Sequence, residues 1–150
     1  MTIFEKLRAG VTTDSAEQTR ALAAALPPDT TLALHGDMGV GKTTFVQGLA
    51  QGLGVTEHVT SPTFGIYSVY HGKAPDLRGR GEAGRRLVHL DAYRLVSEHQ
   101  IDALMLEEFL VSPWILAVEW PEKMGPALPD DAWHVTLSIV EGERHRVVLL

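Results

Sequence analysis

The stretch that decides the fold of this chain is Gly36-Asp37-Met38-Gly39-Val40-Gly41-Lys42-Thr43. It fits the pattern G-x-x-x-x-G-K-[ST] at every fixed position. Glycine tolerates positive φ angles, so successive backbone amides can turn inward around an anion. A helix that begins at the end of the stretch adds unpaired N–H groups and a partial positive charge. The pattern therefore predicts a phosphate-binding loop, and its alternative is a glycine-rich turn before an ordinary helix.

The residues on either side of this loop support the first interpretation. The apolar run Thr31–Leu34 precedes it and predicts a buried strand. A helix is expected from Lys42 to about Gln51, where glycines follow. In a loop of this kind the Lys42 ammonium reaches the β- and γ-phosphates of a nucleoside triphosphate, and the Thr43 hydroxyl binds Mg²⁺.

The remaining elements predict an α/β class: a three-layer P-loop NTPase-like fold with a mixed central sheet flanked by helices. Asp14 and Glu17 form a possible capping box for a helix that ends before Pro27 and Pro28. Ser97 and Gln100 offer the same signal for a helix over 98–110. Strands are expected over 65–70, 87–93 and 115–118, and a terminal hairpin is expected over 133–140 and 146–150. The whole chain, 1–150, is predicted to be one domain, with 71–86 as a flexible basic loop.

Composition excludes several classes of protein. At 45% hydrophobic residues, the 150-residue chain can bury a core, and wholesale disorder is not expected. The absence of cysteine rules out disulfides, thiolate zinc sites and a cysteine nucleophile. A net charge of −6 makes the chain a poor binder of nucleic acid by itself. The sequence has neither an apolar run long enough to cross a membrane nor a secretory signal at Met1–Gly10, so we expect a cytoplasmic protein.

Two acidic residues stand at the ends of predicted strands. Asp91 follows Leu87–Leu90, and Glu119 follows Ile115–Val118. Either carboxylate can hold Mg²⁺, directly or through water, or orient an attacking water molecule. The alternative for each is a solvent-exposed charge at a strand end. The D-x-x-G match at Asp76–Gly79 has no strand before it, and no N-K-x-D sequence is present, so ATP is favoured over GTP.

Four blocks of sequence together resemble the TsaE (YjeE) family. They are the loop Gly36–Thr44, Ser61-Pro62-Thr63-Phe64, His89-Leu90-Asp91-Ala92-Tyr93-Arg94-Leu95 and Glu119-Trp120-Pro121. Their order and spacing agree with the family across roughly residues 12–125. The resemblance implies a bacterial ATPase needed to make threonylcarbamoyladenosine beside the anticodon of tRNA. Members of this family work with TsaB and TsaD and hydrolyse ATP to reset that complex, so tRNA is involved only indirectly.

The resemblance also implies roles for single residues. Thr43 and Glu119 would be the Mg²⁺ ligands, and Asp91 would position or activate the attacking water. Lys42 and Thr63 would act at the γ-phosphate, with Ser61–Thr63 as a switch segment. The nucleotide would be bound by Asp37, Met38, Gly39, Val40, Gly41, Lys42, Thr43, Thr44 and Trp120.

Further positions are left open by the resemblance. The adenine can be contacted by residues 11–15, and either Arg144 or Arg146 can approach the nucleotide. Tyr93 and Arg94 belong to the nucleotide block but can instead face partner proteins.

Two other functions fit parts of the sequence. A small kinase that phosphorylates a metabolite would use the arginines of 78–86 as a lid, and a nucleotide-gated adaptor would bind ATP without turnover. A further question is whether the basic loop contacts a phosphate backbone or is merely solvent-exposed. Its basic residues are Lys73, Arg78, Arg80, Arg85 and Arg86.

Overall fold

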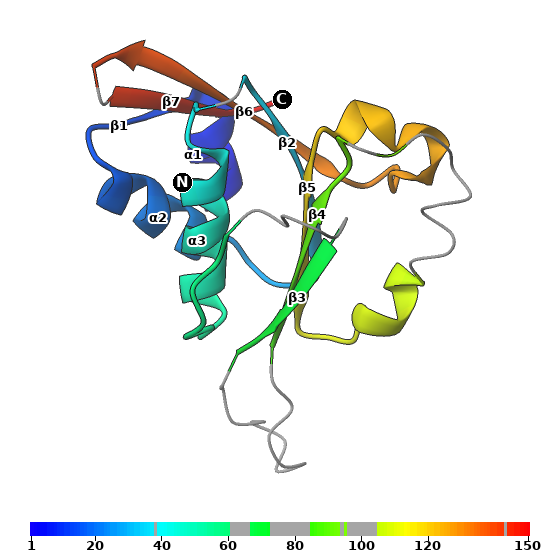
Figure 1. The fold of residues 1–150 in the computed structure, drawn as a ribbon. Coiled ribbons are helices and arrows are strands. Elements are labelled where there is room, and N and C mark those ends of the chain that lie inside the picture. Colours follow the sequence, from blue (N-terminus) through cyan, green and yellow to red (C-terminus); the bar gives the residue numbers. More distant parts are fainter. Residues whose placement is uncertain (38, 61–66, 73–84, 94, 96–104, 143) are drawn as a thin grey trace.

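A computed structural model describes residues 1–37, 39–60, 67–72, 85–93, 95, 105–142 and 144–150. In these residues a seven-stranded mixed sheet has the order β1-β7-β6-β2-β5-β4-β3 (Figure 1). The strands are β1 (Val11–Thr13), β2 (Thr30–His35), β3 (Tyr67–His71), β4 (Arg86–Asp91), β5 (Trp114–Glu119), β6 (Trp133–Glu141) and β7 (Arg144–Leu149). The helices are α1 (Ile3–Ala9), α2 (Ala16–Ala24) and α3 (Lys42–Gly52), with short 3₁₀ helices η1 (Leu106–Phe109), η2 (Pro121–Lys123) and η3 (Gly125–Ala127).

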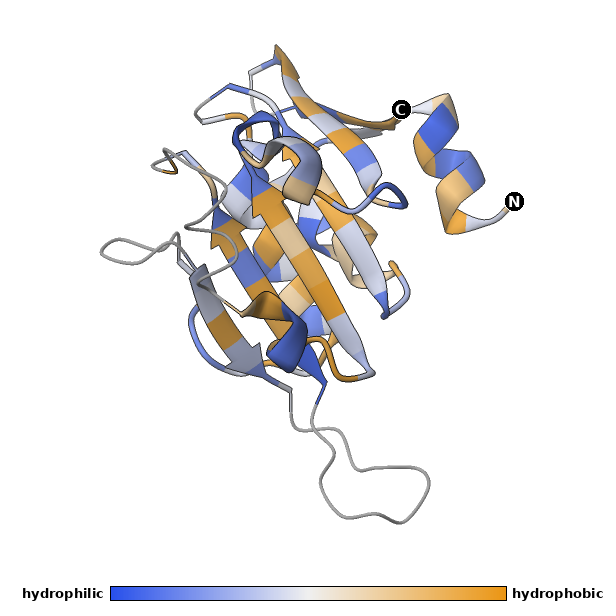
Figure 2. Ribbon diagram, turned by 90° about the vertical axis from the view of Figure 1, so that its right-hand side faces the viewer, coloured by the Kyte–Doolittle hydropathy of each residue, from blue (hydrophilic) through white to orange (hydrophobic). Residues whose placement is uncertain are grey.

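The middle of the sheet is parallel and its edges are antiparallel. Strand β2 pairs in parallel with β5 and β6, and β4 pairs in parallel with β5. Strand β3 is antiparallel to β4, while β7 is antiparallel to both β6 and β1. Strands β2 and β5 are buried along nearly their whole length, as parallel strands covered on both faces must be. Figure 2 shows that these middle strands are largely hydrophobic.

Two hydrophobic clusters lie on opposite faces of the sheet. Phe45, Leu49 and Leu32 belong to the cluster beneath α2 and α3, to which α1 contributes the fully buried Leu7. On the other face, Val88, Leu116 and Met124 pack beneath the 3₁₀ helices. Figure 1 shows α2 and α3 on one side of the sheet and η1–η3 on the other. The predicted three-layer α/β architecture is thus confirmed.

The structure corrects several local predictions. The N-cap of α2 is Ser15, whose side chain accepts from the Gln18 backbone N–H at 3.2 Å, and not Asp14. Gln18 also accepts from the Asp14 backbone N–H, so the capping signal lies one residue later than predicted. His71 and Arg86 belong to β3 and β4 and not to the loop between them. Strand β4 ends at Asp91, two residues earlier than the predicted 87–93.

The predicted helix 98–110 is only partly described. Residues 96–104 lie outside the described residues. Met105 is left-handed, with φ 52°, and the residues after it form the 3₁₀ helix η1 instead of continuing an α-helix. A left-handed residue cannot belong to an α-helix, so the apolar periodicity does not carry through to Leu110. The terminal hairpin is confirmed as β6 and β7, with positive φ at Gly142.

Candidate functional site

The carboxyl ends of β2, β4 and β5 meet at one edge of the sheet. In the parallel register Leu34 of β2 is the partner of Glu119, and Asp91 of β4 is the partner of the same glutamate. Side chains alternate along a strand, and Ile115 and Ala117 of β5 face the cluster beneath α3, so Glu119 faces that side as well. The register therefore places both predicted acids beside the loop that follows β2. In open α/β sheets ligands bind at such an edge.

The loop from Gly36 to Gly41 carries the backbone geometry that an anion site needs. Gly36 and Gly41 have φ angles of 145° and 101°, which side-chain-bearing residues rarely adopt. Gly41 is the N-cap of α3 and offers no side chain to its first turn. The first N–H groups of an α-helix have no carbonyl partner within the helix, so a helix start of this kind is a place where an anion can bind. A Cβ at Gly39 would meet nothing within 4 Å, so the loop is open on that side.

Lys42 is buried, although it is charged. Only 7% of it is exposed. Its ammonium donates to the Gly36 carbonyl oxygen at 2.8 Å and lies 4.6 Å from the centre of the Trp120 ring. A carbonyl oxygen and an aromatic face together compensate for part of the lost hydration of this cation. The side chain thus folds back across the loop that it follows.

The two blocks after β4 and β5 contact each other at this edge. Trp120 adopts a left-handed conformation, with φ 57°, directly after Glu119. Its ring packs against that of Tyr93 with 5.1 Å between centroids. The backbone N–H of Tyr93 donates to Asp91 Oδ1 at 3.0 Å. The turn after β4 therefore fixes the Asp91 carboxylate with one oxygen already bonded.

Glu119 is buried and forms a short hydrogen bond. Its Oε2 lies 2.6 Å from Nε2 of His89, which is fully buried. Glu119 itself is 6% exposed. No local pattern predicts this contact, because His89 lies inside an apolar strand and its partner is far away in sequence.

A small cavity of about 190 Å³ adjoins the loop. It is lined by Leu34, His35, Gly36, Asp37, Lys42, Trp120 and Glu122. His35 Nε2 lies 2.8 Å from His134 Nδ1, and the two rings stack. Burial lowers the pKa of His35 below its usual value; the neighbouring His134 and Lys42 act in the same direction, and Glu122 opposes them. The lowered pKa favours the neutral form of the imidazole at the rim of the cavity.

Other predicted site residues fall into two groups. Met38, Thr63 and Arg94 are outside the described residues, as are Ser61 and Pro62. Asp37, Val40 and Thr44 belong to the loop and the first turn of α3, as expected.

The C-terminal arginines are not found at the loop. Arg144 bonds Asp14 at 3.0 Å, and the guanidinium of Arg146 lies beside Gly10. His145, between them, does approach the loop: a Cβ on Gly41 would lie 3.7 Å from its Nε2. The alternation of side chains along β7 could have predicted this placement, because His145 shares a face with the buried Val147.

The donors at this edge fit a Mg²⁺–nucleotide. Mg²⁺ prefers a few carboxylate or hydroxyl oxygens completed by phosphates and water, and it does not need an all-protein cage. Thr43 on the first turn of α3 and Glu119 are donors of this type. Among the described residues no group of three or more His, Cys, Asp or Glu could hold a metal without such a ligand.

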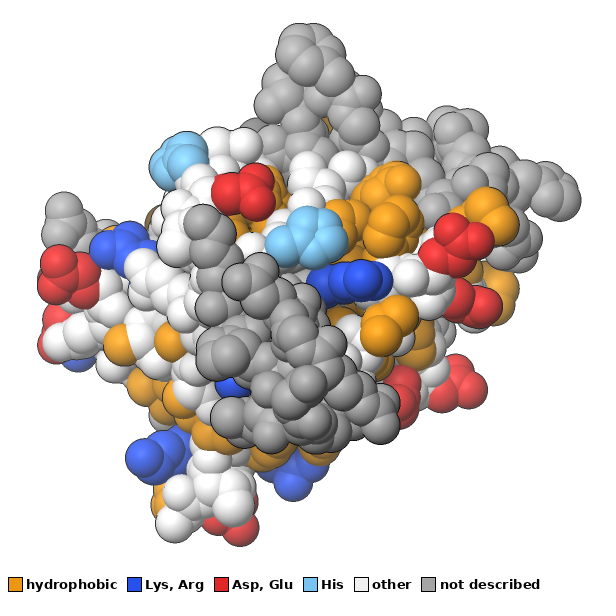
Figure 3. Space-filling view, turned by 90° about the horizontal axis from the view of Figure 1, so that it is seen from below, with side chains coloured by type: hydrophobic (Ala, Val, Ile, Leu, Met, Phe, Trp, Pro, Cys, Tyr) orange, Lys and Arg blue, Asp and Glu red, His pale blue; other side chains and the backbone are white. Residues whose placement is uncertain are grey.

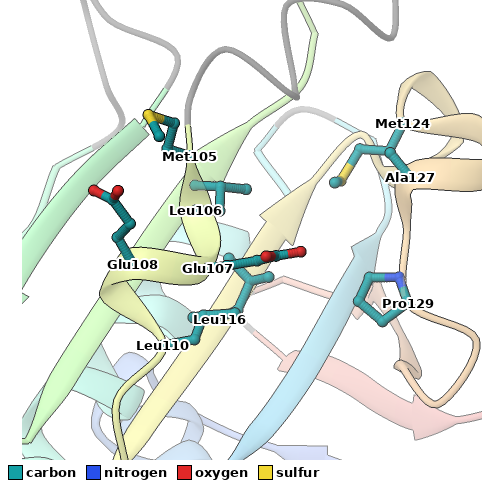
Figure 4. Close-up of a pocket in the computed structure, with 9 residues that line it drawn as sticks. All are labelled: Met105, Leu106, Glu107, Glu108, Leu110, Leu116, Met124, Ala127 and Pro129. Carbon is teal, nitrogen blue, oxygen red and sulfur yellow. The ribbon is translucent and has the colours of Figure 1, made fainter.

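A larger cavity of about 620 Å³ lies between η1 and η3, where Glu107 and Met124 point into the space and Glu108 points away (Figure 4). Figure 3 shows basic and acidic side chains interspersed on one face, without a continuous basic patch among those drawn in colour. Across the described ranges no helix has the length and apolar character that spanning a membrane requires.

Comparisons with known proteins agree with one another. The family model for "Threonylcarbamoyl adenosine biosynthesis protein TsaE" matches residues 12–148. The tRNA threonylcarbamoyladenosine biosynthesis protein TsaE of Treponema pallidum is 32% identical over 136 residues, 90% of this chain and 93% of that protein. The protein of the same name from Synechocystis is 42% identical over 113 residues, 72% of this chain and 64% of that protein. The crystal structure of YdiB from Bacillus subtilis superposes with a TM-score of 0.66 at 28% identity, covering 93% of this chain and 82% of that one.

Proposed function

This chain belongs to the TsaE family of tRNA threonylcarbamoyladenosine biosynthesis proteins, and we propose that it binds and hydrolyses ATP for that modification. It would do so in the cytoplasm, with the TsaB–TsaD complex, and without itself holding the tRNA. Its net charge of −6 is consistent with a chain that leaves nucleic acid to its partners.

One observation carries the proposal: both strand-end acids are register partners at the edge where the phosphate-binding loop lies. A phosphoryl-transfer site needs an anion cradle, a cation, a metal ligand and a group that orients the nucleophile. Gly36–Gly41, Lys42, Glu119 and Asp91 are residues of these types, and the described strands bring them together. A turn that merely preceded a helix would not require either acid at that edge.

Each residue of this site would have a separate task in ATP hydrolysis. Bound Mg·ATP supplies the phosphoanhydride bond that water cleaves to give ADP and phosphate. The Lys42 ammonium, now on the Gly36 carbonyl, would exchange that partner for phosphate oxygens. Thr43 and Glu119 would hold the cation. Asp91, fixed by the Tyr93 backbone N–H, would accept a hydrogen bond from the attacking water.

A metabolite kinase is the second candidate. It would need a pocket for its acceptor beside the phosphate-binding loop. The larger of the two cavities described above lies instead between η1 and η3, next to the second hydrophobic cluster. The fate of the γ-phosphate separates the two functions directly.

The test measures γ-phosphate release from labelled ATP by the chain alone and with purified TsaB–TsaD. We expect slow release of inorganic phosphate alone and a marked stimulation by the complex. Transfer of label to a small metabolite would identify a kinase. ATP binding without release in either condition would identify a nucleotide-gated adaptor.

A further inference from the structure

His89 is a fully buried polar side chain in strand β4, which lies between β5 and the edge strand β3. Its register partner on β5 is Ala117, whose small side chain belongs to the hydrophobic cluster beneath α2 and α3. The glutamate two residues beyond Ala117 is therefore the diagonal neighbour of the imidazole, within reach of a long side chain. The register thus accounts for the 2.6 Å contact between His89 Nε2 and Glu119 Oε2.

The two ring nitrogens of His89 have different surroundings. Nε2 faces a carboxylate, which can only accept, so Nε2 must carry a proton in this bond. Nδ1 is buried and has no hydrogen-bond partner among the described residues. The contact with Glu119 therefore uses Nε2 as its donor, and Nδ1 takes no part in it.

The hydrogen bond from His89 fixes the Glu119 carboxylate through one of its two oxygens and leaves the other oxygen for a ligand. It uses Oε2 and does not occupy Oε1. On β4, the register partner of Glu119 is Asp91, which is also a carboxylate. That position therefore supplies no cation that could orient Glu119. Ligands of a metal are in general held by hydrogen bonds from behind, and loss of such a bond typically weakens metal binding about 10- to 100-fold.

We infer that His89 is a positioning residue that holds the Glu119 carboxylate ready for the divalent cation of the bound nucleotide. The inference rests on the proposed function, because it assigns a task within that site. His89 itself would touch neither the cation nor the nucleotide, and it would act only through the orientation of Glu119.

The test compares two amide variants, His89→Gln and His89→Asn. The side-chain nitrogen of Gln lies as many bonds from the backbone as imidazole Nε2, so Gln keeps a donor toward Glu119. The nitrogen of Asn corresponds to Nδ1, so Asn loses that donor at nearly equal polarity. ATP affinity is titrated by calorimetry in EDTA and at increasing Mg²⁺. For His89→Asn we expect the Mg²⁺ concentration of half-maximal effect to rise about 10-fold or more, and for His89→Gln less than about 3-fold.

The outcomes of this titration separate the inference about His89 from the proposed function. Affinity in EDTA should stay close to that of the wild type in both variants, which a general loss of folding would not allow. An unchanged Mg²⁺ requirement in His89→Asn, or equal losses in both variants, would overturn the inference. A wild-type chain that binds no ATP under any condition would instead refute the proposed function.

A measurement on the wild-type chain covers the case in which His89→Asn does not fold. Nitrogen-detected NMR of the imidazoles, assigned with His89→Gln, should find the His89 proton on Nε2. Its signals should shift when a non-hydrolysable ATP analogue is added with Mg²⁺, and shift less with the analogue in EDTA. A proton on Nδ1, or the same response in both conditions, would contradict the inference.

Discussion

Gly36 is the loop position where a single methyl group should do most damage. Its φ of 145° lies where side-chain-bearing residues are strained. An ideal Cβ there would lie 2.6 Å from the Leu137 carbonyl oxygen and 2.7 Å from a methyl of Val40. Leu137 belongs to β6 and is the register partner of Val147 on β7, directly after the last residue of β6 that pairs with β2, so its backbone cannot easily withdraw. We predict that Gly36→Ala strongly destabilises the fold.

The magnitude follows from two contributions. Strained backbone costs about 1–3 kcal/mol, and forcing a methyl into a packed site costs about as much again. The expected loss is therefore about 2–6 kcal/mol, a large part of the roughly 5–15 kcal/mol that holds a typical domain together. Gly39→Ala is the matched control, because its φ is also positive, at 82°, but nothing lies within 4 Å. It should lose only about 1–2 kcal/mol, the cost of the left-handed conformation.

Urea unfolding followed by far-UV circular dichroism measures both variants. With a slope of about 2 kcal/mol per molar urea, a loss of 4 kcal/mol lowers the midpoint by about 2 M. The Gly39→Ala midpoint should fall by less than about 1 M on the same slope. Equal midpoints for the two variants would refute the argument, since the contact with Leu137 and Val40 is what distinguishes them.

Three further predictions concern the side chains around the loop. Lys42→Ala should weaken ATP binding, measured by calorimetry, roughly 10- to 150-fold, which is the range expected for the loss of a charged hydrogen bond. The control is Lys123→Ala, at an exposed lysine, which should have no such effect. Because the Lys42 ammonium contacts the Trp120 ring, Mg·ATP should change the tryptophan fluorescence; Trp120→Phe should abolish the change, and Trp114→Phe should retain it. Burial lowers the pKa of His35 in the folded chain. As the pH falls, the unfolded chain therefore takes up a proton on this imidazole before the folded chain does, near pH 6.5. The free energy of unfolding falls from that pH down to the lowered pKa of the folded state. The thermal midpoint should therefore decrease between pH 7 and 5 by less in His35→Gln than in the wild type, and an identical decrease would count against this account of the His35–His134 pair.

The loop and the strands around it were predictable because their signals are local. The glycines, Lys42 and the preceding apolar run stand together in the sequence. Asp91 and Glu119 each follow an apolar run, and parallel strands bring such ends to one edge. The sequence could therefore indicate which residues meet there, although not which atoms they bond.

The residues that sequence reasoning missed depend on distant partners. His89 sits in an apolar run, and only the pairing of β4 with β5 brings it to Glu119. Helix α1 has one fully buried residue, Leu7, packed with residues from the far end of the chain. Its capping box of Thr2 and Glu5 was a local signal that was available. The N-cap of α2 was placed one residue early, because Asp14 and Ser15 are both good caps and the sequence alone does not choose between them.

The measurement that tests the central claim most directly is the separation of ATP binding from hydrolysis in Asp91→Asn. The amide keeps an oxygen for the Tyr93 backbone N–H, so the turn after β4 should be preserved. With TsaB–TsaD present, and with the exposed Asp130→Asn as control, we predict ATP affinity near that of the wild type. We also predict that phosphate release falls about 100-fold or more, as expected for the loss of a group that positions or activates water. Release at the wild-type rate would contradict the account, because Asp91 would then have no part in the reaction.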